Sequence, residues 1–243
     1  MESSVLRVQL DGRLLRLTLT RAAKRNALNL ELCRALVGAV EIARPDEVGC
    51  VLLDAEGPAF CAGMDLGEST DVDADELAAV HERLFTMNRW AHVPIVAAVQ
   101  GRALAGGVGL VAQAHIVVAE EMAQFGLTEV RIGMWPMLIY RSVEAAIGER
   151  RALEWSLTGR LVGAAEAQAA GLVHEIREFP RAEELALEIA GRGAEAIGFG
   201  MRYFRESRGL GFAEAGQLAA RLRKELMATP AYMESAAKFK PKV

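Results

Sequence analysis

The chain has 243 residues, of which 52% are hydrophobic and 25% are charged, and its formal net charge is −4. This length allows one large α/β domain with a sizeable core, and the composition is that of an ordinary globular protein. The acidic balance excludes a general nucleic-acid binder, which needs a strong excess of basic side chains to neutralise phosphates.

The cysteines and histidines of the chain indicate no metal site. The three cysteines lack Cys-x-x-Cys spacing, so they predict neither a disulfide framework nor a zinc site. Sparse cysteine usage favours a reducing cytoplasm, and the N-terminus shows no basic region followed by an apolar run, as a signal peptide would. The histidines also lack ligand spacing, and we interpret each as a surface or satisfied core residue. They are His81, His92, His115 and His174.

A long apolar stretch runs over residues 93–119, where Arg102 is the only charge with histidine counted neutral. A lipid-facing helix needs about 20 consecutive apolar residues, whereas Pro94 and several glycines and polar residues interrupt this stretch. The pattern therefore predicts a buried strand–turn–helix–strand, and we expect no membrane partner.

The first half of the chain alternates predicted strands and helices. Asp11-Gly12-Arg13 separates two short apolar runs, and Asp-Gly is typical of a hairpin turn. The predicted segments are the hairpin strands Val5–Leu10 and Leu14–Leu19, a helix Leu30–Ala43 closed by Pro45, a strand Val48–Asp54, an irregular Phe60–Leu66, a helix Glu76–Ala91, a strand Pro94–Val99, a short helix Gly106–Ala112 and a strand His115–Ala119.

The second half is predicted to be mostly helical after Arg150. The predicted segments are the helices Arg151–Leu157 and Ala164–Ala170, a strand Leu172–Ile176, and the helices Ala182–Gly193, Ala196–Arg208 and Phe212–Met227. Strands that alternate with helices early, followed by helices alone, favour an α/β core with a helical C-terminal region.

Two glycine-containing segments are candidates for binding a negatively charged oxygen. The first is Phe60–Leu66, and the second is Gln100–Leu110, where a strand breaks into glycines and a helix begins. The free N–H groups and the dipole at a helix start suit an anion, and one donor from each segment would form an oxyanion hole. The alternative is that these glycines only permit tight turns or close packing.

Glu129 is the candidate catalytic carboxylate. Its flanks, Phe125, Leu127, Val130 and Ile132, are apolar, so the segment is predicted to be largely buried. A carboxylate in a low-polarity site is costly unless it is paired, so it is either salt-bridged or functional. Arg131, two residues away, is the candidate structural partner, and the sequence leaves both interpretations open.

The order and spacing of these segments resemble the crotonase superfamily, the enoyl-CoA hydratase/isomerase family. The resemblance rests on Ala-Gly-Met-Asp-Leu, on Gly-Arg-Ala-Leu-Ala-Gly-Gly and on Phe-Gly-Leu-Thr-Glu-Val-Arg-Ile-Gly, together with Arg21–Leu28, Leu157–Arg160 and Ala164–Val173. It implies an α/β, crotonase-like spiral of ββα units with a helical C-terminal region. Residues 1–190 would form the acyl-CoA-binding core, and 191–243 a helical trimerisation or capping region in a homotrimer or hexamer.

The resemblance also implies roles for individual residues. The N–H groups of Met64 and Gly106 would form the oxyanion hole, and Glu129 would be the acid/base. The implied substrate-binding residues are Arg25, Ala27, Ala62, Asp65, Leu66, Gly107, Phe239 and Lys242. The partner would be an acyl-CoA thioester, with no other cofactor, because coenzyme A is part of the substrate. A solvated, frayed terminus is the alternative for the basic tail that holds Phe239 and Lys242.

The chain departs from the hydratase pattern at Gly109, where typical hydratases carry the first of two glutamates. It also lacks the Gly-Gly-Thr-Gln run after Pro136. Hydration must position a water and deliver a proton, whereas a double-bond shift needs one base that removes a proton and returns it. We therefore expect an enoyl-CoA isomerase. The alternatives are an enoyl-CoA hydratase, including the methylglutaconyl type, a decarboxylase or other enolate chemistry, and a non-catalytic acyl-CoA-binding scaffold.

Overall fold

The larger sheet of the protein has six strands. The computed structural model describes residues 4–67 and 73–238, so Phe239 and Lys242 lie outside the described residues. The strand order is β1-β2-β3-β4-β6-β9. The first two strands form the predicted antiparallel hairpin, and the remaining neighbours pair in parallel. The strands are β1 (Leu6–Asp11), β2 (Leu14–Leu19), β3 (Cys50–Ala55), β4 (Ile95–Val99), β6 (Ile116–Ala119) and β9 (Glu175–Ile176).

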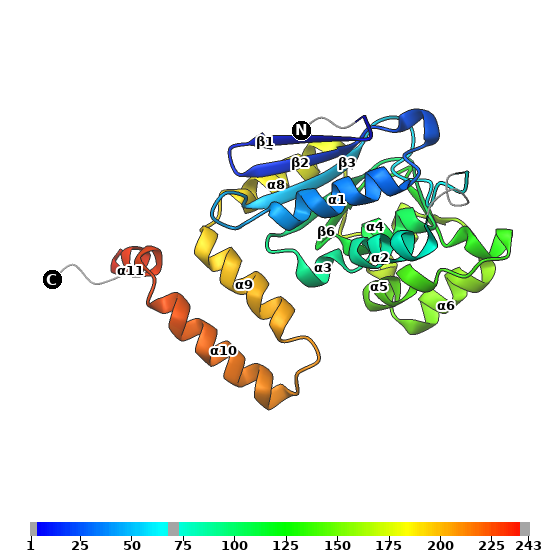
Figure 1. Ribbon diagram of the computed structural model, residues 1–243. Coiled ribbons are helices and arrows are strands. Elements are labelled where there is room, and N and C mark those ends of the chain that lie inside the picture. Colours follow the sequence, from blue (N-terminus) through cyan, green and yellow to red (C-terminus); the bar gives the residue numbers. More distant parts are fainter. Residues whose placement is uncertain (1–3, 68–72, 239–243) are drawn as a thin grey trace.

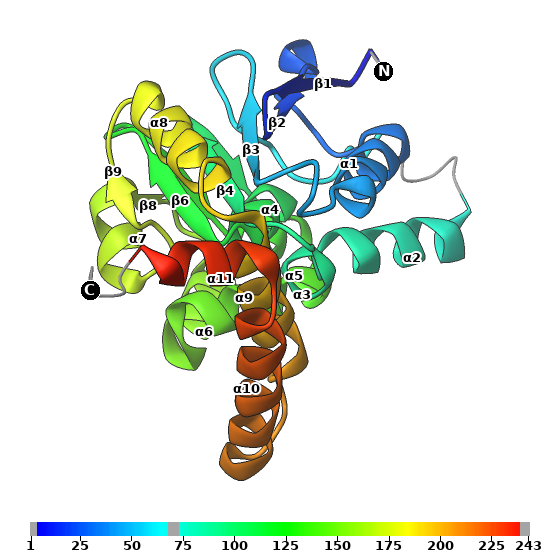
Figure 2. The ribbon, with the colours of Figure 1, turned by 90° about the vertical axis from the view of Figure 1, so that its left-hand side faces the viewer.

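Helices cover both faces of this sheet, which explains why its central strands are apolar throughout. Alternate residues of a strand point to opposite faces. In β3, Val51 and Leu53 join the main core cluster with α1 (Leu30–Ile42), while Leu52 packs in a second cluster with α8 (Phe179–Ala190). The two helices lie on opposite sides of the strands (Figure 2).

A second, three-stranded sheet is formed by strands that lie between β4 and β9 in the chain. Its order is β5-β7-β8, with β5 (Arg102–Leu104) parallel to β7 (Gln124–Gly126) and β8 (Val162–Gly163) antiparallel to β7. The helical elements between β2 and β9, apart from α1, are η1 (Ala22–Lys24), α2 (Ala74–Leu84), α3 (Met87–Trp90), α4 (Gly106–Gln113), η2 (Thr128–Ile132), α5 (Met137–Ile147), α6 (Glu149–Thr158) and α7 (Ala164–Ala170).

Three C-terminal helices extend away from the body of the molecule (Figure 1). They are α9 (Ala194–Glu206), α10 (Phe212–Met227) and α11 (Pro230–Ala237). An ion pair of 2.9 Å between Arg202 and Glu225 joins α9 to α10, and Leu218 and Leu222 are buried. Phe212 remains fully exposed. In residues 4–67 and 73–238, no helix is long and apolar enough to cross a lipid bilayer.

The observed elements differ from the predicted ones at several places. The helix predicted over Glu76–Ala91 is divided into α2 and α3, because the chain breaks helical geometry near Thr86, whose hydroxyl donates to the Glu82 carbonyl at 2.8 Å. Helices α5 and α11 are absent from the prediction. Pro136 is the N-cap of α5, and Pro230 is the first residue of α11, a position that proline fits. The strand predicted over Leu172–Ile176 shrinks to β9.

Candidate active site

A cavity of about 560 Å³ brings the two glycine-containing segments and the candidate carboxylate together. Its lining includes Ala62, Met64, Gly106 and Glu129. Apolar side chains complete much of the lining, among them Leu28, Leu66, Phe85, Ile132, Trp135, Leu138 and Ile139. A mostly apolar cavity with a few convergent polar groups is the usual form of a small-molecule site.

The two glycine-containing segments touch each other in this cavity. A Cβ placed on Gly63 would lie 2.9 Å from the Ala105 Cβ and 3.3 Å from the Gly106 nitrogen, so only glycine allows this approach. Gly63 also has a φ of +94°, which side chains other than hydrogen rarely adopt. Among the described residues, the N–H groups of Met64 and Gly106 donate no hydrogen bond. Two unused donors therefore lie beside a close contact between the segments.

Ala105 fixes the beginning of α4 in a strained conformation. Its φ of +49° and ψ of −121° are unusual for a residue with a Cβ, and such strain persists only where the surroundings enforce it. Its N–H donates to the Gly126 carbonyl at 2.8 Å, at the end of β7. The first turn of α4 is thereby tied to the strand that leads into η2, the element that carries Glu129.

Glu129 lies in the cavity without a counter-charge. Its Oε2 is buried and has no hydrogen-bond partner among the described residues, and no ion pair joins it to Arg131. Burial raises the pKa of the Glu129 carboxyl from 4.5 to about 6. The salt-bridge interpretation is therefore wrong for this side chain: Arg131 is exposed and lines the same cavity without pairing with it. A partly buried carboxyl with a raised pKa is suited to exchange protons near neutral pH.

Gly109 is closed off by packing. A Cβ at this position would overlap the Ile139 side chain and would lie 2.9 Å from the Phe85 ring. The space that a second carboxylate would need is thus occupied by the first turn of α5 and the end of α2. Ile139 and Phe85 therefore fill the space that a side chain at position 109 would occupy.

Only some of the substrate-binding residues predicted from the sequence line the cavity. Ala62 and Leu66 line the cavity. Arg25 and Ala27 are outside the cavity lining but shortly precede Leu28, which is part of it. The Arg25 carbonyl accepts the Ala62 N–H at 2.9 Å. Gly107 is buried outside the lining, where a Cβ would overlap the Cys61 carbonyl. The structure therefore gives Gly107 a role in close packing.

Asp65 has its carboxylate engaged within the protein. It forms a 2.9 Å ion pair with Arg21, which holds the pKa of the Asp65 carboxyl below its usual range. Arg21 also donates to the Ala27 carbonyl. Sequence reasoning missed this arginine as a side chain that connects the N-terminal loop to the segment carrying Met64.

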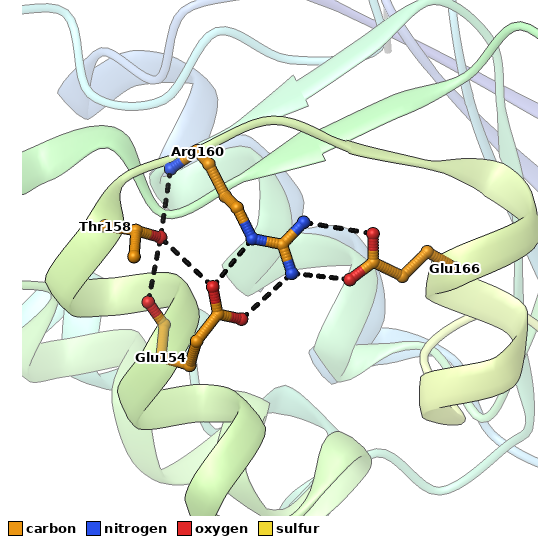
Figure 3. A network of polar contacts seen from close by, with 4 residues as sticks. All are labelled: Glu154, Thr158, Arg160 and Glu166. Carbon is orange, nitrogen blue, oxygen red and sulfur yellow. Dashed lines mark hydrogen bonds and ion pairs between the residues drawn. The ribbon is translucent and has the colours of Figure 1, made fainter.

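An ion-pair network joins α7 to α6, the helix that packs against the element carrying Glu129 (Figure 3). Arg160 pairs with Glu154 at 2.7 Å and with Glu166 at 2.5 Å, and so connects α6 to α7. The turn just before it touches η2, because a Cβ on Gly159 would lie 2.9 Å from the Val130 side chain. Helix α6 thus packs against η2 from outside the cavity, and the ion pairs of Arg160 join α6 to α7.

The comparisons with known proteins all indicate the same family. Residues 10–238 match the family model described as "Enoyl-CoA hydratase/isomerase". A probable enoyl-CoA hydratase of Rhizobium meliloti is 34% identical over 98% of this chain and 96% of its own length. A 2,3-dehydroadipyl-CoA hydratase of Escherichia coli is 35% identical over 79% of this chain and 76% of its own.

The solved structures give the same result for the fold. The crystal structure of an enoyl-CoA hydratase of Mycobacterium smegmatis superposes with a TM-score of 0.90 at 26% identity. It covers 97% of this chain and 95% of that chain.

Proposed function

We propose, since this chain belongs to the enoyl-CoA hydratase/isomerase family, that it is an enoyl-CoA isomerase in which Glu129 is the single acid/base. The observation that carries this proposal is the combination of an unpaired, partly buried Glu129 with a Gly109 position whose surrounding space is filled by Ile139 and Phe85. One carboxylate is sufficient to move a double bond, because the same group removes a proton from one carbon and returns it to another.

The mechanism uses the two unused donors of the cavity. The thioester carbonyl oxygen of a 3-enoyl-CoA would accept hydrogen bonds from the N–H groups of Met64 and Gly106. Glu129 takes a proton from C2, the electron pair moves into a dienolate whose charge rests on the carbonyl oxygen, and Glu129 delivers the proton to C4. The double bond thereby moves from C3–C4 to C2–C3. Each oxyanion donor lowers the barrier by about 3–4 kcal/mol in comparable sites.

Hydration is the second candidate, because the relatives described above carry hydratase names. In that reaction a water adds to C3 of a 2-enoyl-CoA and a proton is delivered to C2. Glu129 alone would have to position the water and transfer the proton, since no second carboxylate among the described residues lines the cavity. This requirement is why the geometry favours the double-bond shift.

Product analysis with the purified protein distinguishes isomerisation from hydration. We expect 3-enoyl-CoA and 2-enoyl-CoA to interconvert without 3-hydroxyacyl-CoA, and Glu129→Gln to abolish turnover while leaving coenzyme A thioester binding intact. Accumulation of 3-hydroxyacyl-CoA from the 2-enoyl substrate would replace the isomerase assignment with the hydratase. Saturable binding with no turnover across a panel of enoyl-CoA thioesters would indicate a non-catalytic acyl-CoA-binding protein.

A further inference from the structure

His81 differs from the other histidines of the chain in its surroundings. Its side chain lines the same cavity as Glu129, and the residue is only 4% exposed. Its Nε2 is buried and has no hydrogen-bond partner among the described residues. The Nε2 of His115 is also buried without a partner, but His115 does not line this cavity. His115 and His174 each accept a strand N–H through Nδ1, from Ile95 at 3.0 Å and from Val117 at 3.1 Å. Those two rings have a structural role that His81 lacks.

The imidazole of His81 is held in an apolar environment. Its closest ring neighbour is Phe85, one helical turn later, with the ring centroids 5.7 Å apart. Burial lowers the pKa of His81, and no charged side chain contributes to that shift. A neutral imidazole carries one N–H donor and one nitrogen acceptor. It is therefore suited to an uncharged polar group.

His81 is separated in the chain from most other polar side chains of the cavity. Thr128, Glu129 and Arg131 come from η2 and Trp135 from the loop after it, whereas His81 is contributed by α2. The cavity therefore has a hydrogen-bonding group that the proposed reaction at Glu129 does not use. The Nε2 atom itself has almost no accessible surface, so a bound oxygen would reach it only after the imidazole ring turns toward the cavity. A buried polar atom without a partner is unfavourable, and a bound molecule that supplies the partner removes that cost.

We propose that His81 is a specificity-determining residue that hydrogen-bonds an oxygen on the acyl chain beyond the reacting carbons. The cavity would then select acyl groups that carry a hydroxyl or keto oxygen over plain hydrocarbon chains of equal length. This inference rests on the proposed function, in which an acyl-CoA thioester occupies the cavity. A site built around a buried polar group rejects an analogue that lacks the matching oxygen, because binding the analogue leaves that group unpaired.

Calorimetric binding of saturated, unreactive thioesters tests the proposal without turnover. The ligands are hexanoyl-CoA, 4-oxohexanoyl-CoA, 5-oxohexanoyl-CoA and 6-hydroxyhexanoyl-CoA. We expect at least one oxygenated ligand to bind the wild-type protein about five- to tenfold more tightly than hexanoyl-CoA, the range of one net hydrogen bond. His81→Leu should remove that preference and His81→Gln should keep part of it. His92→Leu is the matched control, because His92 lies outside this cavity.

The outcomes separate this proposal from the proposed reaction. Equal wild-type affinity for all four ligands, or a preference that survives in His81→Leu, would overturn the role of His81 whether or not isomerase turnover is found. If His81→Leu does not fold, as judged by its circular dichroism melt, His81→Phe takes its place with the same expectation. Absence of isomerisation, with the binding preference present and dependent on His81, would reject the reaction alone.

Discussion

The Ala105 N–H donates to the Gly126 carbonyl at 2.8 Å, and this bond joins the two halves of the cavity. Ala105 directly precedes Gly106, and Gly126 lies three residues before Glu129. The distance between the α4 N-terminus and the carboxyl-bearing η2 is therefore set by a main-chain contact rather than by flexible side chains. The proposed reaction requires positioning of this kind, because a misplacement of about 1 Å is costly in rate.

Gly63→Ala should lower kcat/KM by about 10²-fold. The new methyl group would meet the Ala105 Cβ at 2.9 Å and the Leu104 carbonyl at 3.0 Å, and the φ of +94° is unfavourable for alanine. The Met64 N–H would consequently move away from Gly106, and loss of one oxyanion donor costs about 10²–10³ in rate. Gly67→Ala is the control, because its nearest neighbour would be 3.6 Å away and its φ is not positive. Equal activity of the two variants would contradict the role of Met64.

Glu129→Gln should stabilise the fold at neutral pH. The carboxyl has a pKa of about 6 in the folded protein, against an ordinary value of 4.5 in the unfolded chain, so the folded state binds the proton more tightly. Above about pH 6 the ionised carboxyl carries the full cost of burial, which is up to about 2 kcal/mol. Below about pH 4.5 both states are protonated and the cost disappears.

The measurement is chemical unfolding of the wild-type protein and Glu129→Gln at several pH values. We expect the variant's advantage to be constant above about pH 6 and to decline as the pH falls toward about 4.5. Glu121→Gln serves as a control at an exposed glutamate. A variant that is less stable than the wild type at every pH would mean that the Glu129 carboxylate has a stabilising partner in solution.

Activity should rise with pH through about 6, because Glu129 must be ionised to accept the substrate proton and its pKa is raised to about 6 by burial. The pH dependence of kcat/KM reports the free enzyme, so its acidic limb should have a midpoint near this value. Rates measured on a 3-enoyl-CoA between about pH 5 and 8 provide the test. A midpoint near 4.5 would show that the carboxyl is solvated before substrate binds.

The sequence predicts those parts of the molecule that local patterns determine. Helix α1 and the first hairpin follow from apolar spacing, Pro45 and the Asp-Gly turn, and the structure confirms them. The apolar flanks of Glu129 predict a largely buried segment, which is confirmed for Phe125 and Leu127 but wrong for Val130 and Ile132, which are 37% and 57% exposed. Helix α5 escapes prediction because its first turn, Met137–Tyr140, lacks a hydrophilic capping side chain and carries large exposed apolar residues.

Other features depend on contacts between distant segments, which a single sequence does not display. Ile139 packs against Gly109, which lies 30 positions earlier in the chain, and neither local sequence pattern predicts this contact. His81 and Phe85 have helical spacing, but that spacing does not tell which side of α2 faces a cavity. From the sequence alone, this histidine is therefore interpreted as a surface or core residue.

Gly109→Glu should destabilise the protein rather than create a hydratase. The side chain would overlap Ile139 and meet Phe85, and overpacking of a core costs about 1–3 kcal/mol before the cost of burying a carboxylate is added. Gly38→Glu is the control, since its helical site is exposed and open. The double variant Gly109→Glu/Ile139→Ala should recover part of the stability, measured by thermal unfolding. A fully stable single variant would show that α5 moves readily to admit a second carboxylate.

Gly159→Ala should reduce both stability and activity through η2. Gly159 and Gly133 both adopt left-handed conformations, with φ of +58° and +75°, so alanine at either position is strained by about 1 kcal/mol or more. At Gly159 the methyl group would also lie 2.9 Å from Val130, one residue from Glu129, whereas at Gly133 it would meet nothing within 4 Å.

The difference between these two variants therefore isolates the contact between the α6 turn and η2. We expect urea unfolding to show a larger loss for Gly159→Ala, by about 1 kcal/mol, together with a lower kcat on a 3-enoyl-CoA. Gly133→Ala should lose stability with a smaller change in kcat. If both variants lose the same stability and rate, the turn before Arg160 does not position Glu129, and the network of Arg160 with Glu154 and Glu166 stabilises only the helices that it joins.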